Sequence, residues 1–589
     1  MGSRRRGKRF WSQGEPFVWA SGAALAAVLA LTGVLIWVIL SNGLGVFWPA
    51  AVAQVELSDG QVVLGQWMRE ATNSDTAVRS VQLKTGNRDL DSQRQDFHWF
   101  ELDAIRQRTY PPEVYVLERV EHGNLYGLLD GLKTPQLELP ASRSHASRGN
   151  ASVSTLRVAS PRTQSVRDLR SHAERGNEVP ASADLSQRFR AALAEVRQRR
   201  SAEIEPLAAR LSTLNYQLQD LRKTILKAEY RQQQAGRSLP EIATRVAELR
   251  ERERRLMQES DRLVADKQTR EAALREQGAT FRVGAGTLHT VALADIVRSY
   301  QPNSMGLLSK LGHYASKVWE LLASEPRESN TEGGLFPAIF GTVMLVFLMA
   351  VSCFPLGVLA GVYLGEYARE GWLVRLVRIA VNNLAGIPSI VYGIFGLGFF
   401  VYGLGGLLDH WLYPERVAAN ISTFGTGGVL WASLTLGLLT IPVVIVSTEE
   451  ALRTIPRVFR ESSHALGATK LQTLLRVLLP IASPGIMTGF ILAMARAAGE
   501  VAPLMITGVV KLAPTLPVDG QAPFFHPDRK FMHLGFHIFD IAFQSPNVEA
   551  TKPMVFVTTT LLVLIVLTMS SVAIYLRNSL RKRFSSRAM

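Results

Sequence analysis

The chain has 589 residues, 47% of them hydrophobic, and a formal net charge of +15 at pH 7. Its apolar residues are unevenly spread, which excludes both an ordinary soluble enzyme and a bare membrane bundle and favours membrane spans plus a large aqueous insert. Much of the positive charge flanks apolar runs instead of forming one patch, so we interpret it as a membrane-orientation signal and expect no nucleic-acid binding. Cys353 is the single cysteine, so the chain can form no internal disulfide and its redox compartment cannot be read.

The first apolar run covers residues 17–40 and follows a basic cluster, RRRGKR. It is longer than the roughly 7–15 residues of a signal-peptide core and reaches the ~20 residues needed to span a bilayer. A cleaved signal remains the alternative, because Ala51-Val52-Ala53 could serve as a signal-peptidase site. We expect a basic cytoplasmic N-terminus and a retained first transmembrane helix in residues 1–45.

An aqueous insert follows the first span. Short alternating apolar runs in residues 54–135 predict a β-rich region, and the Ser- and Arg-rich stretch that follows predicts a flexible linker, together forming residues 46–185. Apolar residues then recur in steps of three and four over residues 186–278, interrupted by Gly236 and Pro240, which predicts an antiparallel coiled-coil hairpin with solvated charged faces. Residues 279–332 form a membrane-proximal segment, whose β-like start we expect to pair with the first β-region.

The last part of the chain, residues 333–589, has five more apolar runs. We predict spans at 336–363, 379–401, 427–446, 484–509 and 555–575. With the N-terminus in the cytoplasm, six crossings return the basic C-terminus (RNSLRKRF) to the cytoplasm and place the insert outside, as the positive-inside rule requires. The expected fold is an α-helical polytopic membrane protein with an external insert that contains the β-rich region and the hairpin.

A polar amphipathic segment, ESSHALGATKLQTLLRVLLP at 461–480, separates two of these spans. It suits a short helix, a turn at Gly467, and a second helix that ends at Pro480. Its apolar surface for a partner would come from four leucines: Leu466, Leu471, Leu474 and Leu475. The alternative is an amphipathic helix that lies on lipid.

Two opposite charges, Arg496 and Glu500, follow in the span predicted at 484–509. We expect Arg496 in the middle of this helix and Glu500 one turn further on the same face, where charge is costly unless it serves function. An arginine suits bidentate binding of an oxyanion, and the carboxylate would balance its charge or accept a hydrogen bond from a protonated oxyanion. The alternative is a structural salt bridge between two helices.

Further polar groups surround Pro388, where a broken helix would expose backbone to a cavity. Asn382, Asn383 and Ser389 are therefore candidate pathway residues, with hydrogen bonding between membrane helices as the competing role. A later stretch holds three histidines close to two aspartates: His526, His533, His537, Asp528 and Asp540. Their spacing matches no standard zinc pattern, so we expect a surface loop or a contact for a binding protein and no metal site.

The segment at 461–480 resembles the cytoplasmic EAA loop of ATP-binding-cassette importer permeases, E-A-A-x3-G-x9-I-x-L-P. Both alanines are serines here, and valine replaces the isoleucine. The resemblance implies docking into a separate ATPase through seven residues: Glu461, Ser462, Ser463, Gly467, Leu471, Leu479 and Pro480. The chain contains no G-x4-G-K-[ST] motif, so we expect no cofactor here and ATP and Mg²⁺ on a partner subunit.

ARAAGEVAPLMITG and NNLAGIPSIVYGIFGLGFF resemble permeases of the phosphate-specific transport (Pst) system, especially the PstA type. The resemblance covers about residues 325–580. It implies a type I importer-like permease in the bacterial inner membrane that takes up inorganic phosphate with a second similar permease, two cassette ATPases and an external phosphate-binding protein. In such permeases the R-x3-E pair is implicated in translocation, so Arg496 and Glu500 carry over by position.

Two alternatives remain open from the sequence. The same machine could move another oxyanion, such as molybdate or sulfate. A membrane sensor is the alternative from another class, since an external coiled coil behind an anchor resembles receptor architecture, but the five late spans argue against it. The resemblance says nothing about the role of the insert.

Overall fold

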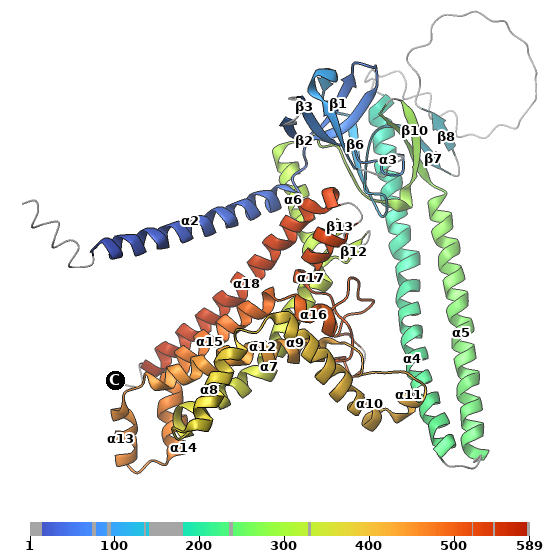
Figure 1. Cartoon of the computed structure of the whole chain (residues 1–589). Helices are drawn as coiled ribbons and strands as arrows, with labels where there is room; N and C mark the ends of the chain where they lie inside the picture. Colours follow the sequence, from blue (N-terminus) through green and yellow to red (C-terminus); the bar gives the residue numbers. More distant parts are fainter. Residues whose placement is uncertain are drawn as a thin grey trace, which may run out of the picture. The chain divides into compact units, whose positions relative to one another are not determined.

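The computed structural model describes residues 15–72, 78–90, 96–134, 137–140, 181–234, 240–284, 286–327, 332–520, 522–545 and 548–585 (Figure 1). The chain divides into two compact units. The β-rich unit contains Pro49–Ala228 and Ala235–Lys310, and the membrane unit contains Met1–Trp48, Glu229–Gln234 and Leu311–Met589. The basic N-terminal cluster, most of the expected linker and Gly236 lie outside the described residues.

The β-rich unit begins with a five-stranded antiparallel sheet in the order β4-β3-β2-β1-β5. Its strands are β1 (Val52–Leu57), β2 (Val62–Thr72), β3 (Arg79–Lys84), β4 (Phe97–Glu101) and β5 (Ile105–Thr109), and a 3₁₀ turn, η1 (Leu102–Ala104), precedes β5. Alternate residues of β1 and β3, such as Val55 and Leu83, point into an apolar core. This is the β-structure that the alternating pattern predicts.

A second antiparallel sheet follows, in the order β10-β9-β7-β6-β11, with β8 paired to β7. Its strands are β6 (Val114–Arg119), β7 (Asn124–Thr134), β8 (Leu137–Pro140), β9 (Gly278–Val283), β10 (Thr287–Ala292) and β11 (Ile296–Tyr300), and η4 (Leu293–Asp295) precedes β11. Because β9 pairs with β7, the second β-like stretch does return to the first β-region.

The two sheets repeat one motif. Strands β1, β2, β3, β4 and β5 pair in the same way as β6, β7, β9, β10 and β11, and a 3₁₀ turn precedes the last strand in both. Even a loop hydrogen bond recurs, from Ser58 N to Ala104 O at 2.8 Å and from Val120 N to Asp295 O at 2.9 Å. The insert therefore contains two units that share one five-strand order, and the second unit is interrupted by a helical segment and carries the additional strand β8.

An ion-pair cluster joins the two sheets. Arg119 on β6 donates two hydrogen bonds to Asp89 at 2.8 and 2.9 Å, and His289 on β10 lies 2.9 Å from the same carboxylate. Burial alone would raise the pKa of Asp89, but these two hydrogen-bond partners and the charge of Arg119 bring the pKa well below its ordinary value. The carboxylate therefore stays ionised and links the β3–β4 loop to the second sheet.

The helical segment comprises α3 (Ala181–Arg199), a π-helical turn (Arg200–Ile204), α4 (Glu205–Gln234) and α5 (Pro240–Arg275). Leu221 of α4 packs in one apolar cluster with Leu249 of α5. Ion pairs join Arg210 to Glu259 at 2.7 Å and Arg222 to Glu253 at 2.6 Å. The partner numbers fall on α5 as they rise on α4, so the two helices run antiparallel, as Figure 1 shows.

The membrane unit contains, among the described residues, six helices long and apolar enough to cross a bilayer. They are Phe17–Gly45, Phe336–Tyr367, Ser389–Leu412, Val429–Arg453, Lys470–Gly499 and Thr551–Ser579. The corresponding elements are α2 (Glu15–Gly45), α7 (Phe336–Val362) with η6 (Tyr363–Tyr367), α9 (Ser389–Phe395) with η7 (Gly396–Gly405) and α10 (Gly406–Leu412), α12 (Val429–Arg453), α14 (Lys470–Thr473) with η8 (Leu474–Leu478) and α15 (Leu479–Gly499), and α18 (Val548–Ser585).

Shorter elements connect these spans. They are α6 (Leu307–Ala323), β12 (Pro326–Arg327), β13 (Glu332–Gly333), α8 (Trp372–Leu384), α11 (Pro414–Ala418), α13 (Arg457–Ala465), α16 (Ala502–Thr507), α17 (Leu534–Phe539) and η9 (Asp540–Gln544).

Helix α12 is the centre of the membrane unit and the most buried of the six spans. Glycines on α7 allow a close approach, since a Cβ at Gly357 would lie 2.8 Å from Val444 and one at Gly361 would lie 2.6 Å from Thr448. Gly489 of α15 contacts Ser447 in the same way. Small residues thus let three membrane helices pack backbone against backbone.

Two predicted spans are misplaced. The third does not run from 379 to 401, because the helix breaks at Pro388 and the apolar helix is Ser389–Leu412, preceded by the separate amphipathic helix α8. Proline lacks the N–H that a continuing helix needs and restricts the residue before it. The fifth does not run from 484 to 509, because its helix begins at Lys470 and ends at Gly499.

Candidate functional sites

The first candidate site is the segment between α12 and α15. Helix α13 ends at Ala465, and Gly467 turns the chain with a φ of 81°, a conformation that glycine adopts at little cost. Helix α14 then begins with a capping box, in which Thr469 and Gln472 satisfy each other's backbone N–H groups. The predicted short helix and turn at Gly467 are therefore present.

The second helix of this segment does not end at Pro480, as the sequence predicted. It continues from α14 through the π-helical η8 into α15, and Pro480 occupies the first turn of α15. Proline is tolerated in a first turn, and the π-helical segment relieves the hydrogen-bond ladder just before it. The segment is thus joined rigidly to a membrane helix.

The outer face of this segment is apolar and exposed. Five side chains contribute, with Leu466 the most exposed at 89%: Val458, Phe459, Leu466, Leu471 and Leu475. Leu474 was expected on this face, but it is buried against Leu452 and Leu478. The reason is the continuous helix from Lys470, which turns Leu474 towards α12.

The other predicted coupling residues divide between the surface and the interior. Glu461 and Ser462 are exposed beside Gly467. Ser463 forms a hydroxyl–hydroxyl hydrogen bond with Thr473 at 2.9 Å, and Leu479 and Pro480 are half-buried. Ser463 therefore holds the two short helices together.

Arg460 anchors α13 to the membrane helices. Its guanidinium lies 3.0 Å from the carboxylate of Glu366 at the end of the first core span. It also donates hydrogen bonds to the carbonyls of Ile455 at 2.8 Å and Leu452 at 2.9 Å, at the end of α12. A displacement of α13 would therefore be transmitted to two spans.

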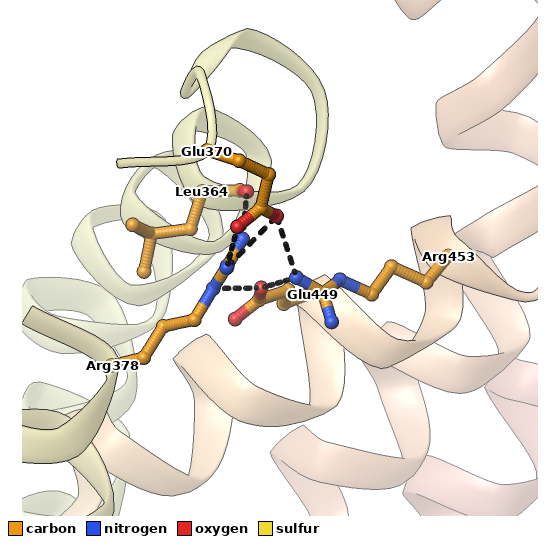
Figure 2. A network of polar contacts seen from close by, with 5 residues as sticks. All are labelled: Leu364, Glu370, Arg378, Glu449 and Arg453. Carbon is orange, nitrogen blue, oxygen red and sulfur yellow. Dashed lines mark hydrogen bonds and ion pairs between the residues drawn. The ribbon is translucent and has the colours of Figure 1, made fainter. Parts of the chain in front are cut away.

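A second arginine cluster lies nearby (Figure 2). Arg378 of α8 contacts Glu449 of α12 at 2.8 Å, Glu370 at 3.0 Å and the carbonyl of Leu364 at 3.2 Å, and Arg453 lies 2.9 Å from Glu449. From the sequence, Arg378 is only one of the positive charges that flank the apolar runs. The spacing of Glu449 and Arg453, one helical turn apart, was the one signal that could have indicated the cluster.

The second candidate site is the pair Arg496 and Glu500. Arg496 Nε lies 3.4 Å from Glu500 Oε1, and the two side chains are 33% and 22% exposed. The structure thus brings the pair together, but not in the middle of a helix. Arg496 lies in the last turn of α15, and Glu500 follows in an extended conformation.

The helix breaks here for local reasons. Gly499 is a poor helix former, and Pro503 has no N–H to continue the hydrogen-bond ladder, so it occupies the first turn of α16 instead. The charged pair therefore lies where backbone groups leave the helical ladder. Helix breaks of this kind occur at membrane depth only where protein or a water-filled cavity surrounds them.

The two helix breaks, at Pro388 and at Glu500, lie in elements that pack together. A Cβ at Gly393 of α9 would lie 2.8 Å from Pro503 of α16. Tyr392 donates a hydrogen bond to the carbonyl of Leu384 at 2.6 Å across the first break and belongs to the same apolar cluster as Ala497. The sequence indicated the first break and missed the second.

The polar candidates near Pro388 are not hydrogen-bonded to the charged pair in the described part of the chain. Asn382 and Asn383 are exposed on α8, and Ser389 is half-buried at the start of α9. In the described part of the chain, no hydrogen bond joins any of the three to Arg496 or Glu500. Their role in a pathway stays a prediction.

The histidine-rich stretch forms two polar groups. His526 and Arg529 contact Asp519 at 3.1 and 2.6 Å. His533 and His537 are buried, and Lys511 contacts Asp540 at 3.0 Å. Burial lowers the pKa of both histidines to about 4, assisted for His537 by the charge of Lys511. Within the described ranges, no three metal-ligating side chains converge.

Comparison with known proteins shows the family to which the chain belongs. The model of the family described as "Binding-protein-dependent transport system inner membrane component" matches residues 354–584. A relative from Bacillus subtilis, the probable ABC transporter permease protein YqgH, is 32% identical over 268 residues, which are 45% of this chain and 81% of the relative. The chain belongs to this family of ABC transporter permeases. The expected α-helical, membrane-embedded permease fold is confirmed.

Two further relatives of this permease carry more specific names. The probable phosphate transport system permease protein PstA of Methanocaldococcus jannaschii is 34% identical over 191 residues, which cover 32% of this chain and 60% of the relative. The phosphate transport system permease protein PstA of Mycobacterium leprae is 38% identical over 174 residues, 30% of this chain and 51% of the relative. The permease thus spans between half and three-fifths of these relatives.

Proposed function

We propose that this permease translocates inorganic phosphate as one subunit of an ATP-driven importer in a bacterial inner membrane. The observation that carries the proposal is how few contacts the guanidinium of Arg496 makes. Its guanidinium has Glu500 as its one ion-pair or hydrogen-bond partner among the described residues, at a distance of 3.4 Å. The names of the PstA relatives support phosphate as the oxyanion.

The chemistry of the pair suits a transient anion site. A guanidinium presents N–H donors in a fork that matches two oxygens of a tetrahedral oxyanion. Glu500 can accept a hydrogen bond from a protonated phosphate oxygen, and it can neutralise Arg496 again when the anion leaves. The single long contact between the two side chains costs little to break, so binding and release can both be fast.

Energy would come from a separate ATPase subunit that binds ATP and Mg²⁺. The apolar face around Leu466 and Leu471, beside the exposed Glu461, is a suitable docking surface for such a subunit. Arg460 and Arg378 join this segment and α8 to the ends of the spans, which gives a physical route for the ATPase movement. The complete importer would contain a second similar permease, two ATPases and an external phosphate-binding protein.

The proposed orientation places both termini and the segment with α13 in the cytoplasm. Basic residues gather at that end of the spans, including Arg375, Arg378, Arg453 and Arg457. By the positive-inside rule the β-rich insert then faces the periplasm.

Uptake of radiolabelled phosphate in the Arg496→Gln and Glu500→Gln variants tests the proposal. We expect Arg496→Gln to lower uptake by about 100-fold, the loss of roughly 2.7 kcal/mol of charge-assisted binding. Arg577→Gln, at a half-buried arginine of α18 whose guanidinium donates to the hydroxyl of Thr488, is the matched control and should transport normally. Normal phosphate uptake in both site variants would refute the assigned site.

Two added measurements separate the alternatives. The first is competition for uptake of a radiolabelled oxyanion. If sulfate or molybdate inhibits this uptake and phosphate does not, another oxyanion is the substrate of the same site. Copurification tests the sensor alternative, because a sensor should not retain a cassette ATPase, whereas the permease should lose it in a Leu466→Asp variant.

A further inference from the structure

Helix α6 has an apolar face that the rest of the described membrane unit leaves uncovered. Leu311 is 48% exposed, Trp319 is 71% exposed and Leu322 is 39% exposed. Their spacing of eight and three residues places them on one side of a helix, and Ala315 lies between them. Leu308, 85% exposed, continues the same face by one turn.

The opposite face fixes how α6 is rotated about its axis. Leu321 is buried in a cluster with Leu335, Val557 and Leu561. Glu320 pairs with Lys317 at 3.2 Å and with Arg327 at 2.6 Å. The helix therefore cannot bury Trp319 by rotating without losing these contacts.

The C-terminal end of α6 is bonded to the start of a membrane span. The N–H of Leu335 donates to the carbonyl of Leu321 at 2.7 Å, and the N–H of Phe336 donates to the carbonyl of Ser324 at 3.3 Å. Phe336 is the first residue of the span Phe336–Tyr367. The last turn of α6 thus lies at the level where that span begins.

A second point along α6 lies beside the end of another span. The ring of Tyr314 is 6.4 Å from the ring of Trp48, three residues after α2 ends at Gly45. Val46 and Phe47 pack against the cluster that contains Leu321. Tyr314 and Leu321 are seven residues apart, about 10 Å along the helix. Helix α6 therefore runs along the boundary where α2 ends and α7 begins.

We propose that α6 lies in the headgroup region of the lipid bilayer on that side of the membrane, with the face of Leu311, Ala315, Trp319 and Leu322 towards the acyl chains. An amphipathic helix with one apolar side and a tryptophan is the type of element that binds at this depth. The lipid is the favoured occupant because α6 lies beside the ends of α2 and α7, two apolar helices that are long enough to cross a bilayer. Binding there holds the chain between the β-rich insert and α7 at the membrane surface.

Site-directed spin labelling tests this proposal on the complete chain with its copurifying subunits, in vesicles of phosphatidylethanolamine and phosphatidylglycerol. A nitroxide is attached to Ala315→Cys or Leu322→Cys on the proposed lipid face, and to Ser309→Cys as the matched control, which is also exposed but lies on another side of the helix. Cys353 is buried and remains native, with the unsubstituted chain as the labelling blank. Collision of each label with oxygen and with a water-soluble nickel complex is then measured.

We expect the ratio of oxygen to nickel collisions to be several-fold higher at residues 315 and 322 than at residue 309. Equal nickel access at all three positions would overturn the proposal, because the face would then lie in water. Protection of 315 and 322 from both reagents would also overturn it, since a protein partner and not lipid would then cover the face.

Discussion

Arg378, in the middle of α8, and Arg496, in the last turn of α15, are both arginines of the membrane unit, yet their surroundings differ. Arg378 contacts two carboxylates and one carbonyl at 2.8–3.2 Å. Arg496 has one carboxylate partner, at 3.4 Å. Arg378, with three partners, joins α8 to α12, whereas the single long contact of Arg496 leaves its guanidinium able to meet the anion in the proposed site.

The buried histidines His533 and His537 are a further case of polar side chains with few hydrogen-bond partners. His533 accepts one hydrogen bond from Gly535 N, and neither ring nitrogen of His537 has a hydrogen-bond partner among the described residues. A buried imidazole in this state stays neutral because charging it would require desolvation. Unlike Arg496, these histidines are enclosed, so proton uptake should affect local stability.

The largest expected effect is a loss of stability of α17 when the pH is lowered. Both histidines have a folded-state pKa of about 4 against an ordinary 6.5, so the unfolded chain binds more protons between these values. The stability of α17 should therefore be complete above pH 6.5 and fall as the pH is lowered to about 4, by on the order of 3 kcal/mol per histidine. Hydrogen exchange of α17 peptides, corrected for the pH dependence of intrinsic exchange, measures this loss of stability.

A His537→Gln variant should retain about half of that pH dependence, and a His410→Gln variant at an exposed position should retain all of it. An unchanged pH dependence in His537→Gln would show that other groups cause the acid sensitivity.

The next prediction contrasts the two arginines directly. Arg378→Gln should lower the free energy of unfolding of the permease by about 2 kcal/mol, because Glu449 is nearly buried and keeps only Arg453 as its charge partner. Arg496→Gln should lower it by less than about 0.5 kcal/mol, since its ion pair is partly exposed and long. Unfolding in mixed detergent micelles measures both. Equal losses would contradict the distinction.

Exchange of each arginine for lysine separates the roles of Arg378 and Arg496 further. Arg496→Lys keeps the charge but loses the guanidinium fork, so the apparent KM for phosphate uptake should rise about tenfold, which corresponds to about 1.4 kcal/mol. Arg378→Lys, the matched control outside the proposed site, should leave the KM unchanged. If the KM rises only in Arg378→Lys, the assignment of the two roles is reversed.

The smallest effect concerns the turn at Gly467. A Cβ there would meet no neighbouring atom, so Gly467→Ala changes only the backbone energy at a φ of 81° and should cost about 1 kcal/mol. Gly520→Ala, which also has open space but no such φ, is the control. The denaturation midpoint of the permease measures the difference. A cost equal to that of Gly520→Ala would show that the turn relaxes.

Much of the fold followed from local patterns in the chain. Long apolar runs predicted six membrane helices, four of them at the right place, and alternating residues predicted the β-rich region, because spanning length and sheet periodicity are properties of short segments. The turn at Gly467 and the closeness of Arg496 to Glu500 were also predictable, since residues four apart lie on one face of a helix and α15 continues to Gly499.

The errors occurred where local signals compete. The span predicted at 484–509 crosses the break after Gly499, because apolar composition alone does not reveal where a helix stops. The same limit misplaced Pro480 and Leu474, which belong to a helix that continues from α14 into α15. The repeat of the two sheets escaped notice because a long helical segment separates β7 from β9.

By itself, then, the sequence determined the number of membrane helices and the approximate place of four of them, the polar segment between α12 and α15, and the residues of the charged pair. Only the tertiary structure decided that Arg378 meets Glu449, Glu370 and the carbonyl of Leu364, and that Arg496, within the described ranges, contacts Glu500 alone. The reason is physical. Apolar length and helical period act within a segment, whereas Glu449 reaches Arg378, and Pro503 approaches Gly393, only after distant helices have packed.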